Sequence, residues 1–171
     1  ICGLSTSYSA GLLSFDNGTL WINVAGTSIA TTFTLLKHQW FHTAIVRSSG
    51  TISVYVNGNL VSTPTSITNN LTGTYVALGG YYSTGYVMTG YISNFRVVNS
   101  AIYTSNFTPS TTPLTAITNT TFLSCQSNRF KDNSTNAYTI TVPNGNPSIQ
   151  TFSPFPLTSP YSASDRKSTR L

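Results

Sequence analysis

The chain has 171 residues, and its eight lysines and arginines against three acidic residues give a formal net charge of +5. Charged residues make up only 6% of the sequence and hydrophobic residues 39%, which suits one domain of ordinary size and excludes a disordered chain. No apolar run approaches the ~20 residues of a membrane-spanning helix, so membrane insertion is not expected.

Residue types that favour β-strands dominate from the first predicted element onward. The sequence has no glutamate and few of the residues that fill exposed helix faces, which predicts an all-β protein. Residues 19–24 alternate between apolar and other side chains, with Leu20, Ile22 and Val24 on one face of a predicted strand. Residues 30–36 form a second β-rich run, which predicts another strand.

An antiparallel meander is predicted next. Two strands at residues 40–47 and 51–56 are separated by a turn at 48–50. Asn57-Gly58 follows directly and is a strong hairpin signal, because both residues accept a positive φ. Leu60-Val61 begins the return strand.

The second half of the chain continues with strands and turns. Strands are predicted at residues 75–80, 90–98, 120–125 and 137–142. Pro109 and Pro113 interrupt residues 104–118, which we expect to cross the surface. No helical pattern of useful length occurs, and roughly nine strands at this spacing predict an antiparallel two-sheet sandwich.

The last seven residues differ in composition from the rest. Residues 165–171 hold four of the eleven charged residues and resemble translated read-through of a sequencing adapter, so we expect a non-native tail. Without them the net charge is +3. The remaining cations are scattered and form no basic stripe, so nucleic acid is not an expected partner: Lys37, Arg47, Arg96, Arg129 and Lys131.

Two ordered signatures are similar to those of a known family. The first is Trp40-x-His42-x-Ala44-x-x-Arg47, then Gly50, then Val54-Tyr-Val-Asn-Gly58. The second is Leu78-Gly-Gly80, then residues 90–98, then Ala101-Ile-Tyr103. Together they resemble laminin G-like, concanavalin A-like lectin domains. The resemblance covers about residues 4–155 and implies a jelly-roll sandwich.

The later residues resemble a tandemly repeated sub-type from marine phage and environmental proteins. The matching pieces are Phe107-Thr-Pro109, Pro113-Leu-Thr115, Leu123-Ser-Cys-Gln126, Asp132-Asn-Ser134 and Ser153-Pro-Phe155. This resemblance implies a lectin domain at residues 1–155 whose opening N-terminal strands are missing, and a linker or start of a next repeat at 156–164. The protein is then one piece of a longer chain of repeats.

The superfamily that the chain resembles includes glucanases, so glycoside hydrolysis is a candidate activity. Glycoside hydrolysis ordinarily uses two carboxylates that flank the bond. Outside the tail the chain offers only Asp16 and Asp132, far apart and in turn contexts, so no enzyme activity is expected. His38 and His42 have a metal-ligand spacing only on a helix, and the family match favours packing for His42 and Trp40.

The sequence also argues against a bound cofactor. Some laminin G-like domains hold calcium, but a hard cation needs several oxygen ligands including charged ones, and two separate aspartates make a tight calcium site doubtful. Asp132 is instead interpreted as a turn residue that caps its own backbone. Cys2 and Cys125 are interpreted as two free buried thiols, although a single bridge between them is the alternative.

Aromatic side chains in one loop are the candidate binding site. Tyr81, Tyr82 and Tyr86 cluster between glycines, and their rings are suited to stacking on the C–H faces of a neutral sugar. The alternative is that they pack across the end of the sandwich. Arg47 and Arg96 are expected to hydrogen-bond neighbouring carbonyls rather than a ligand.

The sequence is consistent with three classes of function. The leading hypothesis is a non-catalytic carbohydrate-binding or adhesion module of a larger surface protein or phage virion (tail) protein, which places it extracellularly or on a virion surface. Its partner would be a glycan or cell-surface polysaccharide. The alternatives are a structural spacer in a tail fibre or stalk, and an accessory domain of an enzyme outside this sequence.

Overall fold

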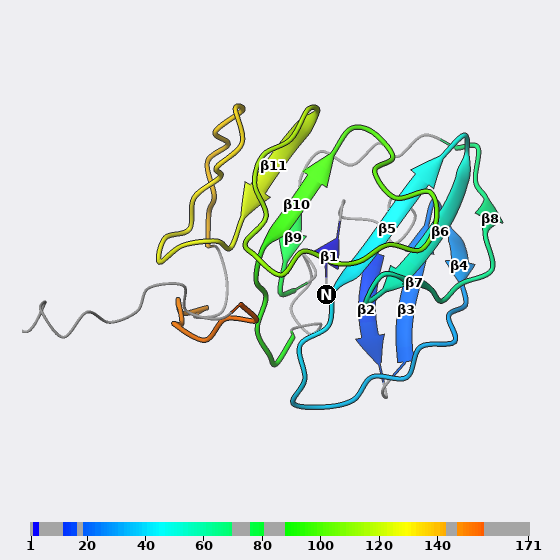
Figure 1. Ribbon diagram of the computed structural model, residues 1–171, viewed down its shortest axis with the longest axis horizontal. Coiled ribbons are helices and arrows are strands. Elements are labelled where there is room, and N and C mark those ends of the chain that lie inside the picture. The colour runs from blue at the N-terminus through cyan, green and yellow to red at the C-terminus, as the bar shows by residue number, and fades with distance from the viewer. Residues whose placement is uncertain are drawn as a thin grey trace, which may run out of the picture.

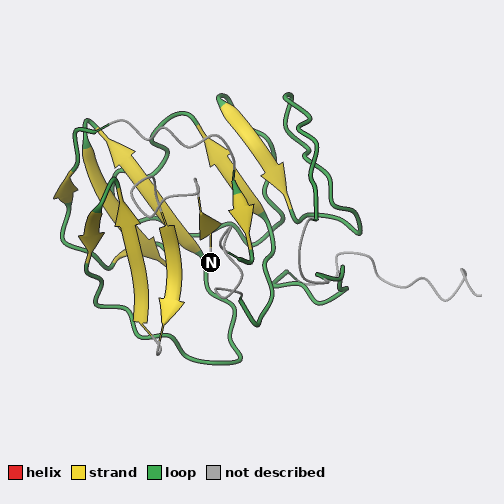
Figure 2. Cartoon of the chain, turned by 180° about the vertical axis from the view of Figure 1, so that it is seen from behind, coloured by secondary structure: helices red, strands yellow, loops and turns green. Residues whose placement is uncertain are grey.

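The computed structural model describes residues 2–3, 12–16, 19–69, 76–80, 88–142 and 147–155, and these residues contain strands and loops but no helix (Figures 1 and 2). This part of the chain contains no helix that is long and apolar enough to cross a membrane. The strands of these described ranges are β1 (Cys2–Gly3), β2 (Leu12–Asp16), β3 (Thr19–Val24), β4 (Thr27–Ile29), β5 (Thr43–Ser48), β6 (Thr51–Val56), β7 (Asn59–Leu60), β8 (Thr65–Ser66), β9 (Ala77–Leu78), β10 (Phe95–Val98) and β11 (Thr120–Ser124).

The strands form two larger sheets and one separate pair. The first sheet has the order β4-β3-β2-β1-β9, and in the second β6 lies between β5 and β7 and also pairs with β8. β10 and β11 pair with each other to one side of β5 and β6 (Figure 1). All neighbouring strands are antiparallel. The predicted all-β antiparallel sandwich is confirmed.

The core lies where β3 and β4 face β6. The predicted apolar face of β3 is confirmed, because Leu20, Ile22 and Val24 are all buried there. Alternation places every second side chain on the inner face of a strand, so two facing sheets can interdigitate such rows. The other members of the core are Ile29, Ile52, Val54, Val56 and Ile67.

The predicted hairpin turns are confirmed. Ser49 and Gly50 have φ values of +47° and +78°, and Asn57 and Gly58 have +49° and +81°. Two successive residues with positive φ form the tight turn whose twist suits antiparallel strands. The meander β5-β6-β7 follows from them, although β7 covers only Asn59–Leu60.

Residues 30–36 do not form the predicted strand. A hairpin turn at Ala25 and Gly26, both at positive φ, places the strand earlier, as β4. The segment that follows crosses between the two sheets: Thr31 makes an isolated bridge to Ser62, and Thr34 one to Thr19. The β-rich composition of residues 30–36 predicts a full strand, but their strand pairing in the described structure consists of these two isolated bridges.

Residues in the left-handed conformation shorten two other predicted strands, and a third starts later than predicted. The strand predicted at 90–98 begins only at Phe95, because Asn94 has a φ of +55° and breaks the alternation. The strand predicted at 120–125 ends at Ser124, because Cys125 has a φ of +60°. β5 begins at Thr43 rather than at residue 40.

The strand predicted at 137–142 is absent. Ala137 has a φ of +47°, and residues 137–142 make no strand pairing within the described structure. Most of their side chains are exposed. β-propensity alone does not make a strand where no neighbouring ladder is available.

The predicted surface crossing at residues 104–118 packs closely against the hairpin turn at Asn57-Gly58. The backbone N–H of Phe107 donates to the Gly58 carbonyl at 2.9 Å, and the Leu60 N–H donates to Asn106 Oδ1 at 3.0 Å. A Cβ atom at Gly58 would overlap the Phe107 carbonyl. The Phe107 ring also lies on Tyr55, with centroids 5.6 Å apart, so the crossing covers the outer face of β6.

Gly58→Ala should destabilise the fold by about 2–5 kcal/mol, because it adds a backbone overlap to the cost of a positive φ. Gly26→Ala is a matched control: Gly26 has a φ of +80° and open space around it. That variant should lose only about 1–2 kcal/mol. Urea unfolding of both variants measures the difference, and equal losses would contradict the close packing of Gly58 against Phe107.

Candidate functional site

The predicted binding residues Tyr81, Tyr82 and Tyr86 lie outside the described residues. The chain is described on either side of them, and the Met88 N–H donates to the Gly79 carbonyl at 2.8 Å. The tyrosine site therefore stays a prediction.

A different group of aromatic side chains gathers on the surface. Trp40, Tyr91 and Phe152 form a cluster, which we call the aromatic cluster. Ring centroids are 5.4 Å apart for Trp40 and Phe152, 6.2 Å for Trp40 and Tyr91, and 5.2 Å for Tyr91 and Phe152. Tyr91 is 59% exposed and Phe152 60% exposed, whereas Trp40 is half-buried beneath them. Large aromatic side chains left exposed together are characteristic of binding surfaces.

Three distant parts of the chain supply the aromatic cluster. Trp40 lies just before β5, Tyr91 lies before β10, and Phe152 belongs to the C-terminal segment at 147–155. In Figure 1 this orange segment lies beside the chain that enters β10. The family match favoured packing for Trp40, Tyr91 falls within the strand predicted at residues 90–98, and no local pattern marks Phe152 as their neighbour.

His42 packs as the family match implied. Its ring lies edge-on to Tyr103 and Phe107, at centroid distances of 6.3 and 5.5 Å. Burial, and to a smaller extent the positive charge of Arg96, lower the pKa of His42, so the ring is neutral at pH 7. His38 is exposed in a turn at a φ of +63°.

Both predicted arginine roles are confirmed. Arg47 Nη2 donates to the Ile67 carbonyl at 2.9 Å. Arg96 Nη1 donates to the Thr115 carbonyl at 2.9 Å. Each guanidinium thus fixes a loop to a strand.

Asp132 is a buried structural carboxylate. It is 1% exposed, and its Oδ1 accepts the backbone N–H groups of Leu123 and Ser134 at 3.0 and 2.9 Å. Its Oδ2 accepts the Ser134 hydroxyl at 2.8 Å and the Tyr138 N–H at 2.9 Å. Burial alone raises the pKa of this carboxyl, but these hydrogen bonds outweigh burial and hold the pKa below its ordinary value. The turn interpretation of Asp132 is confirmed.

The other side chains that could bind a metal or react as thiols do not form a cluster in the described part of the chain. Across the described ranges, no three His, Cys, Asp or Glu side chains come together as metal ligands. Asp16 is the last residue of β2, in a strand whose side chains are not described. Cys125 is a free, half-buried thiol, and burial raises its pKa. The side chain of Cys2 lies outside the described part, so the prediction of two free thiols is confirmed for Cys125 alone.

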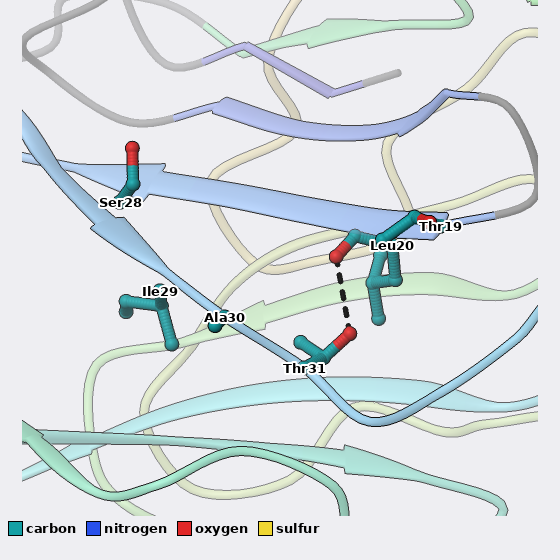
Figure 3. A pocket seen from close by; sticks show the side chains of 6 residues that line it. All are labelled: Thr19, Leu20, Ser28, Ile29, Ala30 and Thr31. Atoms are coloured by element: carbon teal, nitrogen blue, oxygen red, sulfur yellow. Dashed lines mark hydrogen bonds between the residues drawn. The ribbon is translucent and has the colours of Figure 1, made fainter.

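A shallow pocket of about 190 Å³ lies beside the β3–β4 hairpin (Figure 3). Across one end of it the Thr31 hydroxyl donates to the Leu20 carbonyl at 3.1 Å. The pocket has neither an aromatic nor a charged side chain in its wall, and its polar side chains are three hydroxyls. Its lining consists of Thr19, Leu20, Ser28, Ile29, Ala30 and Thr31.

Comparison with known proteins identifies one family. The model of the concanavalin A-like lectin/glucanases superfamily matches residues 3–106, which is more than half of the chain. No curated protein and no solved structure matches the sequence significantly.

Asp132→Asn should destabilise the protein by about 2–4 kcal/mol at pH 7, because an amide NH₂ replaces an acceptor that faces N–H and O–H donors. The wild-type carboxylate has a lowered pKa in the folded state, so its contribution is complete above pH ~5 and is lost as the pH falls below ~4. The difference between the two proteins should therefore shrink in acid. Denaturant titrations at pH 7 and pH 3 measure it.

The exposed neighbour Asn133 provides the control. Its side chain makes one exposed hydrogen bond, to Gln126 Oε1 at 3.2 Å. Asn133→Ala should cost less than about 1 kcal/mol at either pH. An Asp132→Asn protein as stable as the wild type at pH 7 would rule out the role assigned to this carboxylate.

Proposed function

Because the chain belongs to the concanavalin A-like lectin/glucanases superfamily, we propose that it is a non-catalytic carbohydrate-binding or adhesion module of a larger surface or virion protein. The family supports a lectin-like or other binding module in general. The finer statement, that the ligand is a carbohydrate, rests on the surface chemistry of this chain.

The aromatic cluster is the observation that supports carbohydrate binding. Sugar rings present C–H faces that stack on aromatic rings, and the exposed ring of Tyr91 offers such a surface. A neutral sugar needs no counter-charge. The sequence has few charges to offer, and the structure commits Arg47 and Arg96 to backbone carbonyls.

The burial and hydrogen bonding of Asp132 support the non-catalytic part of the proposal. A glycosidase needs carboxylates that reach the scissile bond on both sides. Asp132 is buried, and both of its oxygens already accept hydrogen bonds from the protein. Of the two candidate carboxylates only Asp16 is then left, and glycoside hydrolysis ordinarily requires two.

Tyr91→Ala should weaken binding of the best neutral glycan on an array by about tenfold, equivalent to about 1.4 kcal/mol, because it removes an exposed stacking ring. Tyr138→Ala is the matched control, since Tyr138 is also 59% exposed. That variant should bind like the wild type. Isothermal titration with the array-selected glycan gives both affinities, and equal losses in the two variants would count against the aromatic cluster.

The tyrosine loop predicts a second contact with the same ligand class. Tyr81→Ala or Tyr82→Ala should abolish or strongly reduce array binding if these rings stack on the sugar, and Tyr86→Ala should do likewise. Unchanged binding in all three variants would assign the tyrosines to packing. Absence of any glycan binding by the intact folded protein would instead favour a structural spacer.

A further inference from the structure

The ring of Phe152 connects the C-terminal described segment to the aromatic cluster. The two side-chain hydrogen bonds of residues 147–155 are internal: Gln150 to Ser148 at 2.7 Å, and the Phe155 N–H to Ser153 at 3.2 Å. Within the described structure, no hydrogen bond or strand pairing joins this segment to a sheet. The ring of Phe152 against Trp40 and Tyr91 holds the segment in place. We call residues 147–155 the strap.

Phe152 lies where a stacked ligand ring would lie. Its plane is inclined by 33° to the Trp40 indole at a centroid distance of 5.4 Å, which is close to an offset stack. Against Tyr91 it packs edge-on, at 65°. The strap thus occupies the indole face and leaves much of the Tyr91 ring exposed.

The covered indole has an unmet hydrogen-bond donor. Trp40 Nε1 is shielded from solvent and has no hydrogen-bond partner. A buried donor without an acceptor is unfavourable, so the covered state of Trp40 is not an optimal one. A sugar that stacks on the indole and extends past the ring edge would bring hydroxyl oxygens toward Nε1, whose N–H lies in the plane of the ring.

We infer that, if the module binds carbohydrate as proposed, the strap is a displaceable cover whose Phe152 ring competes with a neutral sugar for the face of Trp40. The strap is weakly held, because it lacks hydrogen bonds to the sheets and Phe152 is itself mostly exposed. A cover closed in about nine of ten molecules raises the apparent Kd about tenfold, because only the open fraction binds.

Phe152→Ala should therefore tighten binding by about three- to tenfold, where loss of a contacting ring would weaken it. The probes are neutral soluble polysaccharides (dextran, mannan, laminarin and xyloglucan), measured with the full chain by affinity electrophoresis. Phe152→Tyr retains the ring and should behave like the wild type. Tyr138→Ala again serves as the control for loss of an exposed ring.

A second measurement needs no ligand. Acrylamide quenching of tryptophan fluorescence should increase in Phe152→Ala and not in Tyr138→Ala, because only the first uncovers Trp40. Weaker polysaccharide binding by Phe152→Ala, or unchanged quenching, would overturn the inference.

The two measurements also separate the inference from the proposed function. If quenching increases but no variant binds any polysaccharide, then the proposed function fails and the competition fails with it, while the cover over Trp40 stands. If the wild type binds and Phe152→Ala binds less tightly, the proposed function stands and the strap is part of the binding surface.

Discussion

Burial of β6 on both faces is the constraint on which the rest of the structure depends. Its inner side chains, among them Val54, pack against the opposite sheet, and its outer Tyr55 is also buried. Such a strand needs a cover on each side. The crossing segment with Phe107 supplies the outer cover, and it can approach only because Gly58 has no side chain. The same crossing leads from β10 to β11, so this contact ties their pair to the central meander.

Three charged side chains make hydrogen bonds that hold the fold together: Asp132, Arg47 and Arg96. Asp132 organises the loop after β11 through four hydrogen bonds, and the two strand arginines fix loop carbonyls.

The structural unit extends past the family match, which ends at residue 106. Phe107 seals the outer face of β6, β11 pairs with β10, and Asp132 binds the backbone of β11 at Leu123. Phe152 then returns to Trp40 within the matched part.

The sequence by itself determined the all-β sandwich, the apolar face of β3, both glycine-containing hairpin turns of the meander, and the internal roles of Arg47, Arg96 and Asp132. These depend on local periodicity, on positive-φ turn residues, or on the family signatures, all of which are written along the chain. Strand ends were predicted less well, because Asn94 and Cys125 adopt the left-handed conformation without a local signal as clear as Asn-Gly. The aromatic cluster was decided only by the tertiary structure. Trp40, Tyr91 and Phe152 meet because the fold brings together segments that lie far apart along the chain, and no period in the sequence encodes such a contact.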